Sequence, residues 1–468
     1  MSQESEQEAF VDSSNAYVEI YGLATSNSKT PFWMHANQYG TVPNSGSLGS
    51  IRAGLANLWN VSSQTNGNLR VGIGFEAVGN AGKTNHFLLP QAYGNVRFKN
   101  WELFIGRKKQ HVGLADSTLS SGSYAWSGNS LPIPKIQIGT MRFVNLPFTN
   151  GWLSFNAFYS DGLFEKGRPY TNDLKLHQKA FYLKIGNKNS RLTLLGGFNH
   201  QVQWGGKTSV QTENGQMPTG FKNYIRAVTG KRYPSGPGIT QFDYENRIGN
   251  HLGTIDLGLE YYGYEYRWFL YRQNIYEDGS LIKLTNIMDG LNGVSIKKQN
   301  SYGAEFEVTE MVFEVLYTKS QGGSTWIKGQ NLGRDNYFNN QQVLDGWSYF
   351  DRTIGTPFIT PSSDTQGTRP EYQFTNNNRV MALHAGLKGT LFQDIIWLTK
   401  LSYSNNSGTY ELPFSPSANQ FSGLLTLQTD LKLFGGSTIT GSFAGDSGKL
   451  YANNFGFSLA LRKNISLN

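Results

Sequence analysis

The residues that could support catalysis or metal binding are scattered along this 468-residue chain rather than grouped in motifs. No two of the seven histidines stand at the i, i+2 or i, i+4 spacing of a local metal site, and there is no cysteine to supply thiolate ligands. Neither a G-x-S-x-G nucleophile elbow nor a phosphate-binding P-loop occurs. We therefore expect no catalytic residues, no metal site and no cofactor, and we expect that the protein is not an enzyme.

Carboxylates are the remaining candidates for acid-base chemistry. Asp256, Glu260, Glu305 and Glu307 lie on the polar sides of alternating segments and could face one shared interior. A glycosidase needs two carboxyl groups held at a fixed separation across a sugar ring, and the sequence cannot place two of these at such a separation. A structural network in which they pair with arginines is favoured over hydrolysis.

Aromatic and planar polar side chains are concentrated between residues 320 and 378, and this pattern favours carbohydrate recognition. Aromatic rings stack on the apolar faces of sugars, whereas Asn, Asp and Arg offer planar hydrogen-bond partners for hydroxyl groups. Taken singly, each such residue is more often one that only folds its segment. The candidate carbohydrate-binding residues are Trp326, Arg334, Asp335, Asn336, Tyr337, Trp347, Tyr349 and Arg352.

The composition indicates which kind of element positions these residues. Hydrophobic residues make up 38% of the chain, aromatic residues 14% and charged residues only 16%. A disordered chain is poor in aromatics, and a soluble domain carries about 25% charged residues. No run of 18 apolar residues occurs, which excludes a transmembrane helix. A barrel wall gives this average composition, because only alternate residues face lipid.

Alternation with a period of two residues is the dominant pattern, as in Leu69 to Ala77 and Ile255 to Tyr261. The connections after even-numbered segments are short and those after odd-numbered segments are mostly long. This parity is typical of outer-membrane barrels, which have tight periplasmic turns and long outer loops. The pattern predicts about 18 strands, over residues 17–25, 51–60, 68–78, 87–98, 101–109, 135–143, 151–160, 178–186, 191–204, 253–262, 264–275, 301–309, 311–319, 379–388, 393–404, 421–433, 437–445 and 454–463.

The predicted fold is all-β: a transmembrane antiparallel β-barrel over residues 17–468, preceded by a polar periplasmic tail at 1–16. Both termini are expected in the periplasm of a Gram-negative bacterium. Long outer loops are expected near 205–252 and 320–378. The first should contain a short helix near 219–230 that packs into the lumen or over the mouth. The second should fold on itself and occlude the lumen, because a disordered loop would be poor in aromatics.

The net charge of +8 is spread along the chain, and basic runs such as 107–109 are short. Nucleic-acid binding usually needs a clustered basic face, so no nucleic-acid partner is expected. A diffuse positive charge would favour acidic glycans or anionic lipid head groups. It could equally serve only to keep the protein soluble.

Several segments resemble the Wzi family of capsule assembly proteins: Thr30-Pro31-Phe32-Trp33, Asn37-Gln38-Tyr39-Gly40, Leu176-His177-Gln178-Lys179, Gln203-Trp204-Gly205-Gly206, Gly333-Arg334-Asp335-Asn336-Tyr337 and Gly346-Trp347-Ser348-Tyr349. The resemblance extends roughly from Tyr17 to the C-terminus. It implies an 18-stranded outer-membrane barrel and a lectin function, in which capsular or exopolysaccharide is tethered to the cell surface. Better-known members carry an N-terminal periplasmic helical bundle; because only about 16 polar residues precede the first strand here, we expect that this bundle is missing or was removed.

The expected function is therefore a lectin-like outer-membrane barrel that binds capsular or exopolysaccharide and helps to anchor or assemble it. The expected partners are polysaccharide, outer-membrane lipid and a protein of a surface complex. The alternative is a porin or an accessory subunit of a larger outer-membrane secretion or transport complex. Large open-channel currents would favour the porin, and co-purification of a stoichiometric partner would favour the accessory subunit.

Overall fold

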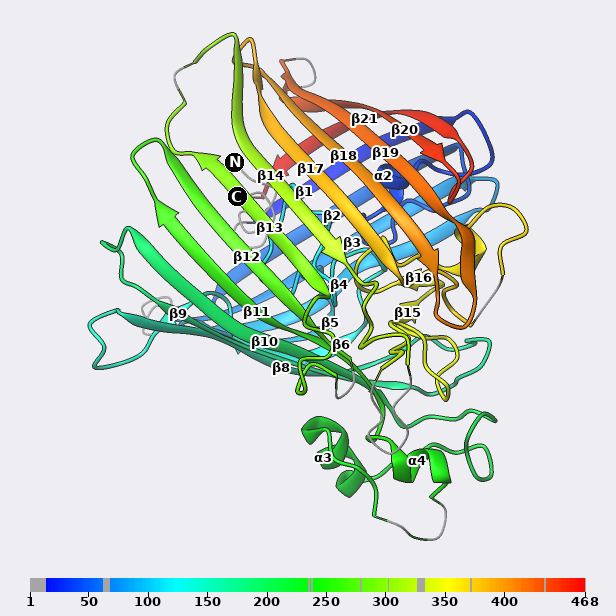
Figure 1. The fold of residues 1–468 in the computed structure, drawn as a ribbon. Coiled ribbons are helices and arrows are strands. Elements are labelled where there is room, and N and C mark those ends of the chain that lie inside the picture. Colours follow the sequence, from blue (N-terminus) through cyan, green and yellow to red (C-terminus); the bar gives the residue numbers. More distant parts are fainter. Residues whose placement is uncertain are drawn as a thin grey trace.

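In the computed structural model, the chain forms one closed antiparallel β-barrel (Figure 1). The structure describes residues 14–467 except for 62–67, 235, 237–238, 278–279, 302, 326–332, 371–372 and 433–434. Almost all of the expected N-terminal tail therefore lies outside the described residues. No described helix is long and apolar enough to cross a membrane.

Within the described residues, 19 strands form the main sheet, and the pairing of the first with the last closes it. Both β6 and β7 pair with β8 and together make one interrupted strand, so 18 strand positions surround the barrel. The strands are β1 (Asn15–Thr25), β2 (Leu48–Asn60), β3 (Leu69–Gly82), β4 (His86–Phe98), β5 (Trp101–Arg107), β6 (Lys135–Thr140), β7 (Val144–Asn145), β8 (Leu153–Leu163), β9 (Lys175–Ile185), β10 (Leu192–Trp204), β11 (Asn250–Tyr262), β12 (Tyr266–Tyr276), β13 (Gly290–Lys298), β14 (Phe306–Tyr317), β17 (Val380–Leu391), β18 (Ile395–Gly408), β19 (Pro413–Leu431), β20 (Ser437–Gly448) and β21 (Asn454–Ser466).

One pair of strands differs from the sequence-based prediction. Strands were expected at 301–309 and 311–319 with a turn at Glu310, but β13 occupies 290–298 and β14 runs through Glu310. A bulge in β14 adjoins this residue, and its carboxylate lies 3.2 Å from the Lys297 ammonium and 3.3 Å from that of Lys388. In the sequence, a charged residue in the middle of a strand is easily taken for a turn residue. Here the lumen supplies lysines that neutralise it.

Successive residues of each strand face two different environments. On β11, Ile255 and Leu257 are exposed on the outer side, whereas Asp256 and Glu260 are buried on the lumen side. This is the pattern of a wall between lipid and a polar interior. Asp256 accepts hydrogen bonds from the Leu114 amide (2.8 Å) and the Tyr182 hydroxyl (3.0 Å).

Of the other three carboxylates singled out in the sequence, two form ion pairs and one is exposed. Glu260 pairs with Arg267, and Glu307 lies 2.5 Å from the Lys298 ammonium. Glu305 is exposed just before β14. Two of the four carboxylates, Glu260 and Glu307, thus form the ion pairs that the sequence favoured, one with an arginine and one with a lysine, whereas Asp256 is held by neutral donors.

The described parts of three long loops fill the lumen and are here called the plug: residues 26–47, 108–134 and 318–379. The first contains α2 (Phe32–His35), and the third contains a two-strand hairpin, β15 (Ser348–Tyr349) and β16 (Arg352–Thr353), and η2 (Ser362–Asp364). Their rings form one hydrophobic core with lumen-facing wall residues; it includes Trp33, Tyr124, Trp126, Tyr337, Phe338, Trp347, Leu252, Tyr271, Leu316 and Val380. The expected occlusion of the lumen by the folded 320–378 loop is confirmed for its described part.

The wall also binds the plug backbone through lumen-facing glutamines. Gln273 accepts a hydrogen bond from the Tyr124 amide (2.8 Å), while Gln201 and Gln203 donate to the carbonyls of Ala125 (2.8 Å) and Gly346 (2.9 Å). These bonds satisfy irregular backbone that would otherwise be buried without partners. The plug is therefore held by polar wall groups as well as by its hydrophobic core.

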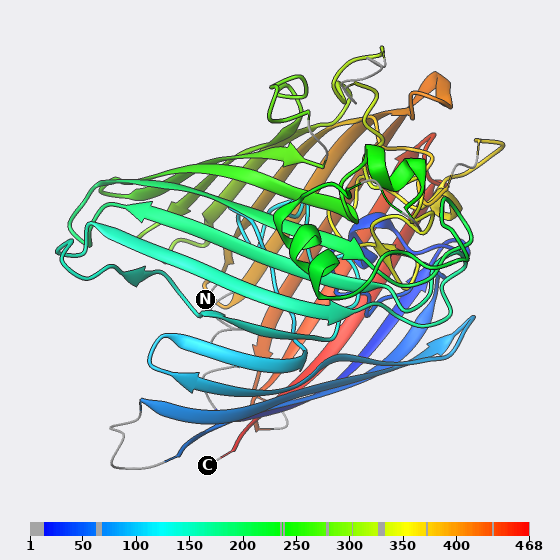
Figure 2. The same ribbon diagram turned by 90° about the horizontal axis from the view of Figure 1, so that it is seen from below.

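The helix expected near 219–230 is present as α3 (Phe221–Thr229), but its position differs from the expectation. Its Tyr224 hydroxyl donates to Asp161 (2.8 Å), and Lys179 donates to the Val228 carbonyl. Both wall residues lie on the outward-facing side of their strands, in phase with the exposed Tyr159 and Phe181. Figures 1 and 2 show α3 and α4 (Gln241–Glu245) against the outside of the wall, beyond β8–β10.

The start of β1 and the end of β21 lie at the end of the barrel that carries the short turns. Asn15 of β1 pairs with Ser466 of β21 and with Ala56 of β2, next to the short β2–β3 connection.

The plug contains an anchor made by two of its loops. The Arg352 guanidinium donates to His35 Nδ1 (2.7 Å) and to the Val42 carbonyl (3.0 Å). Burial, together with the nearby charges of Arg352 and Lys29, holds the pKa of His35 well below its usual value. The imidazole is therefore neutral and able to accept this hydrogen bond.

Replacing Trp347 with alanine should destabilise the plug. The side chain is fully buried in the plug core, and deleting a buried indole leaves a cavity that costs about 3–5 kcal/mol. Equilibrium unfolding in denaturant measures this loss. Phe350→Ala is the matched control, because this ring is about half exposed and its loss should cost less than about 1 kcal/mol. Equal losses in the two variants would contradict the described packing.

Acidification should weaken the anchor between His35 and Arg352. In the unfolded chain His35 takes up a proton near pH 6.5, whereas the folded protein resists protonation. The unfolded state then binds more protons, so stability falls as the pH drops below about 6.5. Thermal midpoints between pH 7.5 and 5 test this. His35→Gln, whose amide oxygen can still accept from Arg352, should show a smaller loss; an unchanged loss would refute this origin.

Candidate functional site

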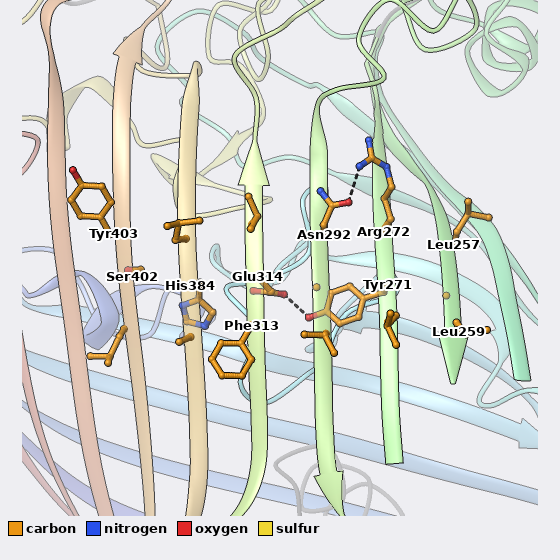
Figure 3. A pocket seen from close by; sticks show the side chains of 18 of the residues that line it. Leu257, Leu259, Tyr271, Arg272, Asn292, Phe313, Glu314, His384, Ser402 and Tyr403 are labelled. Atoms are coloured by element: carbon orange, nitrogen blue, oxygen red, sulfur yellow. Dashed lines mark hydrogen bonds between the residues drawn. The ribbon is translucent and has the colours of Figure 1, made fainter. Parts of the chain in front are cut away.

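A hollow of about 900 Å³ lies in the wall between β11 and β19 (Figure 3). Exposed apolar side chains such as Leu257, Phe313 and Tyr403 line it. On the same strands, Glu314 and His384 alternate with these residues and are buried toward the lumen. The hollow is thus a groove in the lipid-facing surface, and it is unsuited to a hydrated sugar.

A second cavity, about 30 Å³ in volume, lies beside the His35–Arg352 anchor and is lined by aromatic and polar groups. Phe32 stacks between Phe358 and Tyr451, with ring centroids 5.4 and 5.7 Å away. The Asn44 amide donates to Asp364 (2.9 Å). This volume is about that of one water molecule, so the cavity as it stands holds plug loops together rather than a sugar ring.

The structure buries most of the predicted carbohydrate-binding residues. Tyr337, Trp347 and Tyr349 belong to the plug core and have almost no exposed surface. Asp335 accepts from the Ser280 hydroxyl (2.8 Å), and Asn336 accepts from Asn378 (2.6 Å). These side chains fold the loop.

Of the two predicted arginines, Arg334 has a partly exposed side chain. Arg334 lies 3.5 Å from Glu411, and about a third of each side chain remains exposed. Arg352 borders the small cavity described above. Trp326, the eighth predicted residue, lies outside the described residues.

The turn between β15 and β16 has an unusual backbone. Phe350 and Asp351 have φ angles of +48° and +56°, as in the hairpin turns that favour Asn-Gly. Each non-glycine residue in this left-handed region costs about 1–2 kcal/mol. Such strain persists where surrounding contacts impose it, and it is concentrated at ligand-binding sites. Here it keeps an aromatic ring half exposed at the hairpin tip.

The loop at the long-loop end of β8 holds the hairpin in place. Glu165 accepts from the Phe350 amide (2.9 Å) and from the Arg168 guanidinium (3.1 Å). Arg168 also donates to the Ser348 carbonyl (2.9 Å) and lies 3.4 Å from Asp345. The Glu165–Arg168 ion pair therefore fixes the strand that enters the strained turn.

One arginine completes the surface at the hairpin tip. The Arg107 guanidinium donates to the Tyr349 hydroxyl (3.0 Å) and lies 5.9 Å from the centre of the Phe350 ring. The exposed Asp351 carboxylate is next to that ring in the chain. We call Arg107, Tyr349, Phe350 and Asp351 the hairpin platform. It places an exposed ring beside a cation and an anion.

Sequence reasoning selected Tyr349 of the platform but missed Arg107, Phe350 and Asp351. Arg107 is distant in sequence and looked like part of a short basic run. The Phe350-Asp351 pair carries no turn signal, because neither residue favours the left-handed backbone as strongly as Asn-Gly does. Neither a spacing rule nor a composition rule could have found the three residues.

Histidines also come together in a way that sequence spacing did not suggest. Beneath α3, His200 Nε2 lies 2.9 Å from His251 Nδ1, and His177 Nδ1 lies 3.1 Å from Asp161. Across the described part of the chain, no group of three or more histidine or acidic side chains is arranged to hold a metal ion.

A solved structure shares the fold, and others are more distantly similar. Wzi of Escherichia coli, described as a carbohydrate-binding β-barrel involved in group 1 capsule assembly, has a TM-score of 0.64 and 15% identity. The match covers 99% of this chain and 88% of that one. OccK9 (OpdG) of Pseudomonas aeruginosa has a TM-score of 0.48 and 8% identity, with coverage of 98% and 100%. Among curated proteins, the chain has no significant sequence match.

Sequence comparison identifies the family of the chain as well as its fold. The profile of the family described as capsule assembly protein Wzi matches residues 21–385, which is well over half of the 468 residues. The matched range includes the first loop of the plug, α3 and the hairpin platform. The chain therefore belongs to the Wzi family of capsule assembly proteins, and it is an outer-membrane β-barrel of a Gram-negative bacterium.

Proposed function

We propose that this protein is a lectin-like surface barrel that binds capsular or exopolysaccharide and helps to anchor or assemble it. The hairpin platform is the observation that carries the proposal. Family membership supports it, and so does the description of the Escherichia coli protein as carbohydrate-binding. The barrel domain would extend over residues 17–468, as the sequence suggested.

The platform has the chemistry that a sugar requires. The Phe350 ring is half exposed and offers a flat apolar surface, on which the C–H face of a sugar ring can stack. The Asp351 carboxylate can accept hydrogen bonds from hydroxyl groups. The Arg107 guanidinium can donate to the carboxylate of an acidic sugar, in a charge-assisted bond. An acidic polysaccharide thus fits the platform best.

The two predicted arginines have different roles in the proposal. Arg334, with its partly exposed guanidinium, would be a further contact for an acidic chain. Arg352 would act by holding the hairpin through His35. Tyr337 and Trp347 would contribute only by folding the plug, since both are fully buried. Trp326 remains a proposed contact from its sequence alone.

This function requires a definite orientation in the membrane. We place the long-loop end, with the platform, at the cell surface and both termini in the periplasm. The short turns and the paired chain ends lie together at the opposite end of the barrel, as in outer-membrane barrels generally.

The packed plug argues against the alternative of a wide porin. A lumen filled by a hydrophobic core leaves water and ions little room. Planar-bilayer recordings discriminate between the two functions: large open-channel currents from the intact protein would favour the porin.

Phe350→Gly should separate sugar binding from stability. Glycine removes the strain of a left-handed aromatic residue, so the thermal midpoint should stay level or rise. Losing the ring should weaken polysaccharide binding roughly tenfold or more, in line with the free energy of burying a phenyl group. A glycan array with the detergent-solubilised barrel identifies the ligand, and titration of that ligand measures the loss.

The matched control is Phe87→Ala, which removes an exposed ring from the long-loop end of β4. It should leave polysaccharide binding unchanged. Arg107→Gln should weaken acidic glycans more than neutral ones, because only the charge is removed. Full retention by Phe350→Gly would exclude the platform as the binding site.

A further inference from the structure

The helix α3 has two faces with different surroundings. Tyr224, Ala227 and Val228 face the barrel wall: Ala227 packs with Val202 and Trp204, and the Tyr224 ring lies 5.3 Å from the Trp204 ring. A nine-residue helix is not stable alone in water. The wall therefore holds α3 at a fixed position on the outside of the barrel.

The free side of α3 is amphipathic. Phe221 and Ile225 stand four residues apart on one flank and are 77% and 44% exposed. Lys222 is exposed on the side away from the wall, and Arg226 is half-buried there. The exposed Lys231 and Arg232 follow the C-terminal end of the helix. An apolar stripe thus lies beside a cluster of cations.

The strand register places this helix at the edge of the lipid-facing band. Phe181, Phe198 and Ile255 are paired neighbours on β9, β10 and β11, and all three are exposed on the outer side. Two residues further toward the long loops, Lys179 and His200 face the same way beneath α3. Two residues of strand span about 7 Å. The helix therefore begins about where the apolar band ends.

We propose that α3 and the basic residues after it bind phosphate-bearing, anionic lipid head groups at the membrane surface. Phe221 and Ile225 enter the boundary between head groups and acyl chains, which is about 5–10 Å deep for an interfacial helix. Lys222, Lys231 and Arg232 then lie at the level of the phosphates. The inference rests on the orientation proposed above, which puts this surface at the outer leaflet. Continuity with the lipid-facing band distinguishes lipid from a soluble partner as the occupant.

The absence of cysteine from the sequence makes a site-specific test possible. Phe221→Cys and Ile225→Cys, each labelled with an environment-sensitive dye, are placed in nanodiscs of phosphatidylcholine with brominated acyl chains, with or without phosphatidylglycerol. Both labels should show a blue-shifted emission and quenching by bromine. Tyr244→Cys, at an exposed position on α4, is the matched control and should show neither effect.

The charge dependence is tested separately. In neutral detergent, phosphatidylglycerol is titrated against the barrel labelled at position 221. Lys222→Gln, Lys231→Gln and Arg232→Gln should each weaken the apparent affinity about fivefold. Lys188→Gln removes an exposed charge at the short-turn end and should have no effect.

Three results would overturn the inference. They are absence of bromine quenching at both 221 and 225, equal signals at 221 and 244, and displacement of the label signal by polysaccharide rather than by lipid. None of these results bears on sugar binding at the hairpin platform, because the α3 variants retain Phe350 and Arg107. Polysaccharide binding measured on the same samples therefore tests the proposed function independently.

Discussion

Closure of the sheet by the pairing of β1 with β21 is the constraint on which the rest of this structure depends. Inside a bilayer no water is available for backbone groups, so an open sheet edge would leave a row of unsatisfied donors and acceptors. Once the sheet is closed, each strand has lipid on one side and an enclosed interior on the other. The alternation of Ile255, Asp256 and Leu257 follows from that division.

The enclosed interior then determines how the loops fold. The carboxylates, lysines and glutamines of the lumen wall take the place of water as hydrogen-bond partners for irregular backbone. Gln201 donates to the Ala125 carbonyl, and Gln273 accepts from the Tyr124 amide. This allows long loops to bury aromatic rings at the barrel centre without losing hydrogen bonds. The same arrangement leaves only a small part of those loops, such as the Phe350 turn, for contact with ligands.

The sequence predicted the barrel, its strand number and the plugged lumen, because alternation and loop length are local properties that the chain repeats many times. It predicted a strand at 301–309 and missed the one at 290–298, since Glu310 looks like a turn residue unless the lysines opposite it are known. It selected Trp347 and Tyr337 for sugar binding from their residue type, but burial depends on neighbours far along the chain. The position of α3 was equally beyond prediction, because amphipathic spacing does not reveal which side of a wall a helix covers.

The hydrogen bonds between wall and plug also have a consequence for the order of assembly. The segment at 108–134 is synthesised early, yet Tyr124 binds Gln273 of β12 and Leu119 binds His384 of β17. An early segment must therefore wait for partners that are made much later. The part of the plug core around Tyr124 and Leu119 can therefore be completed only once β12 and β17 are in place.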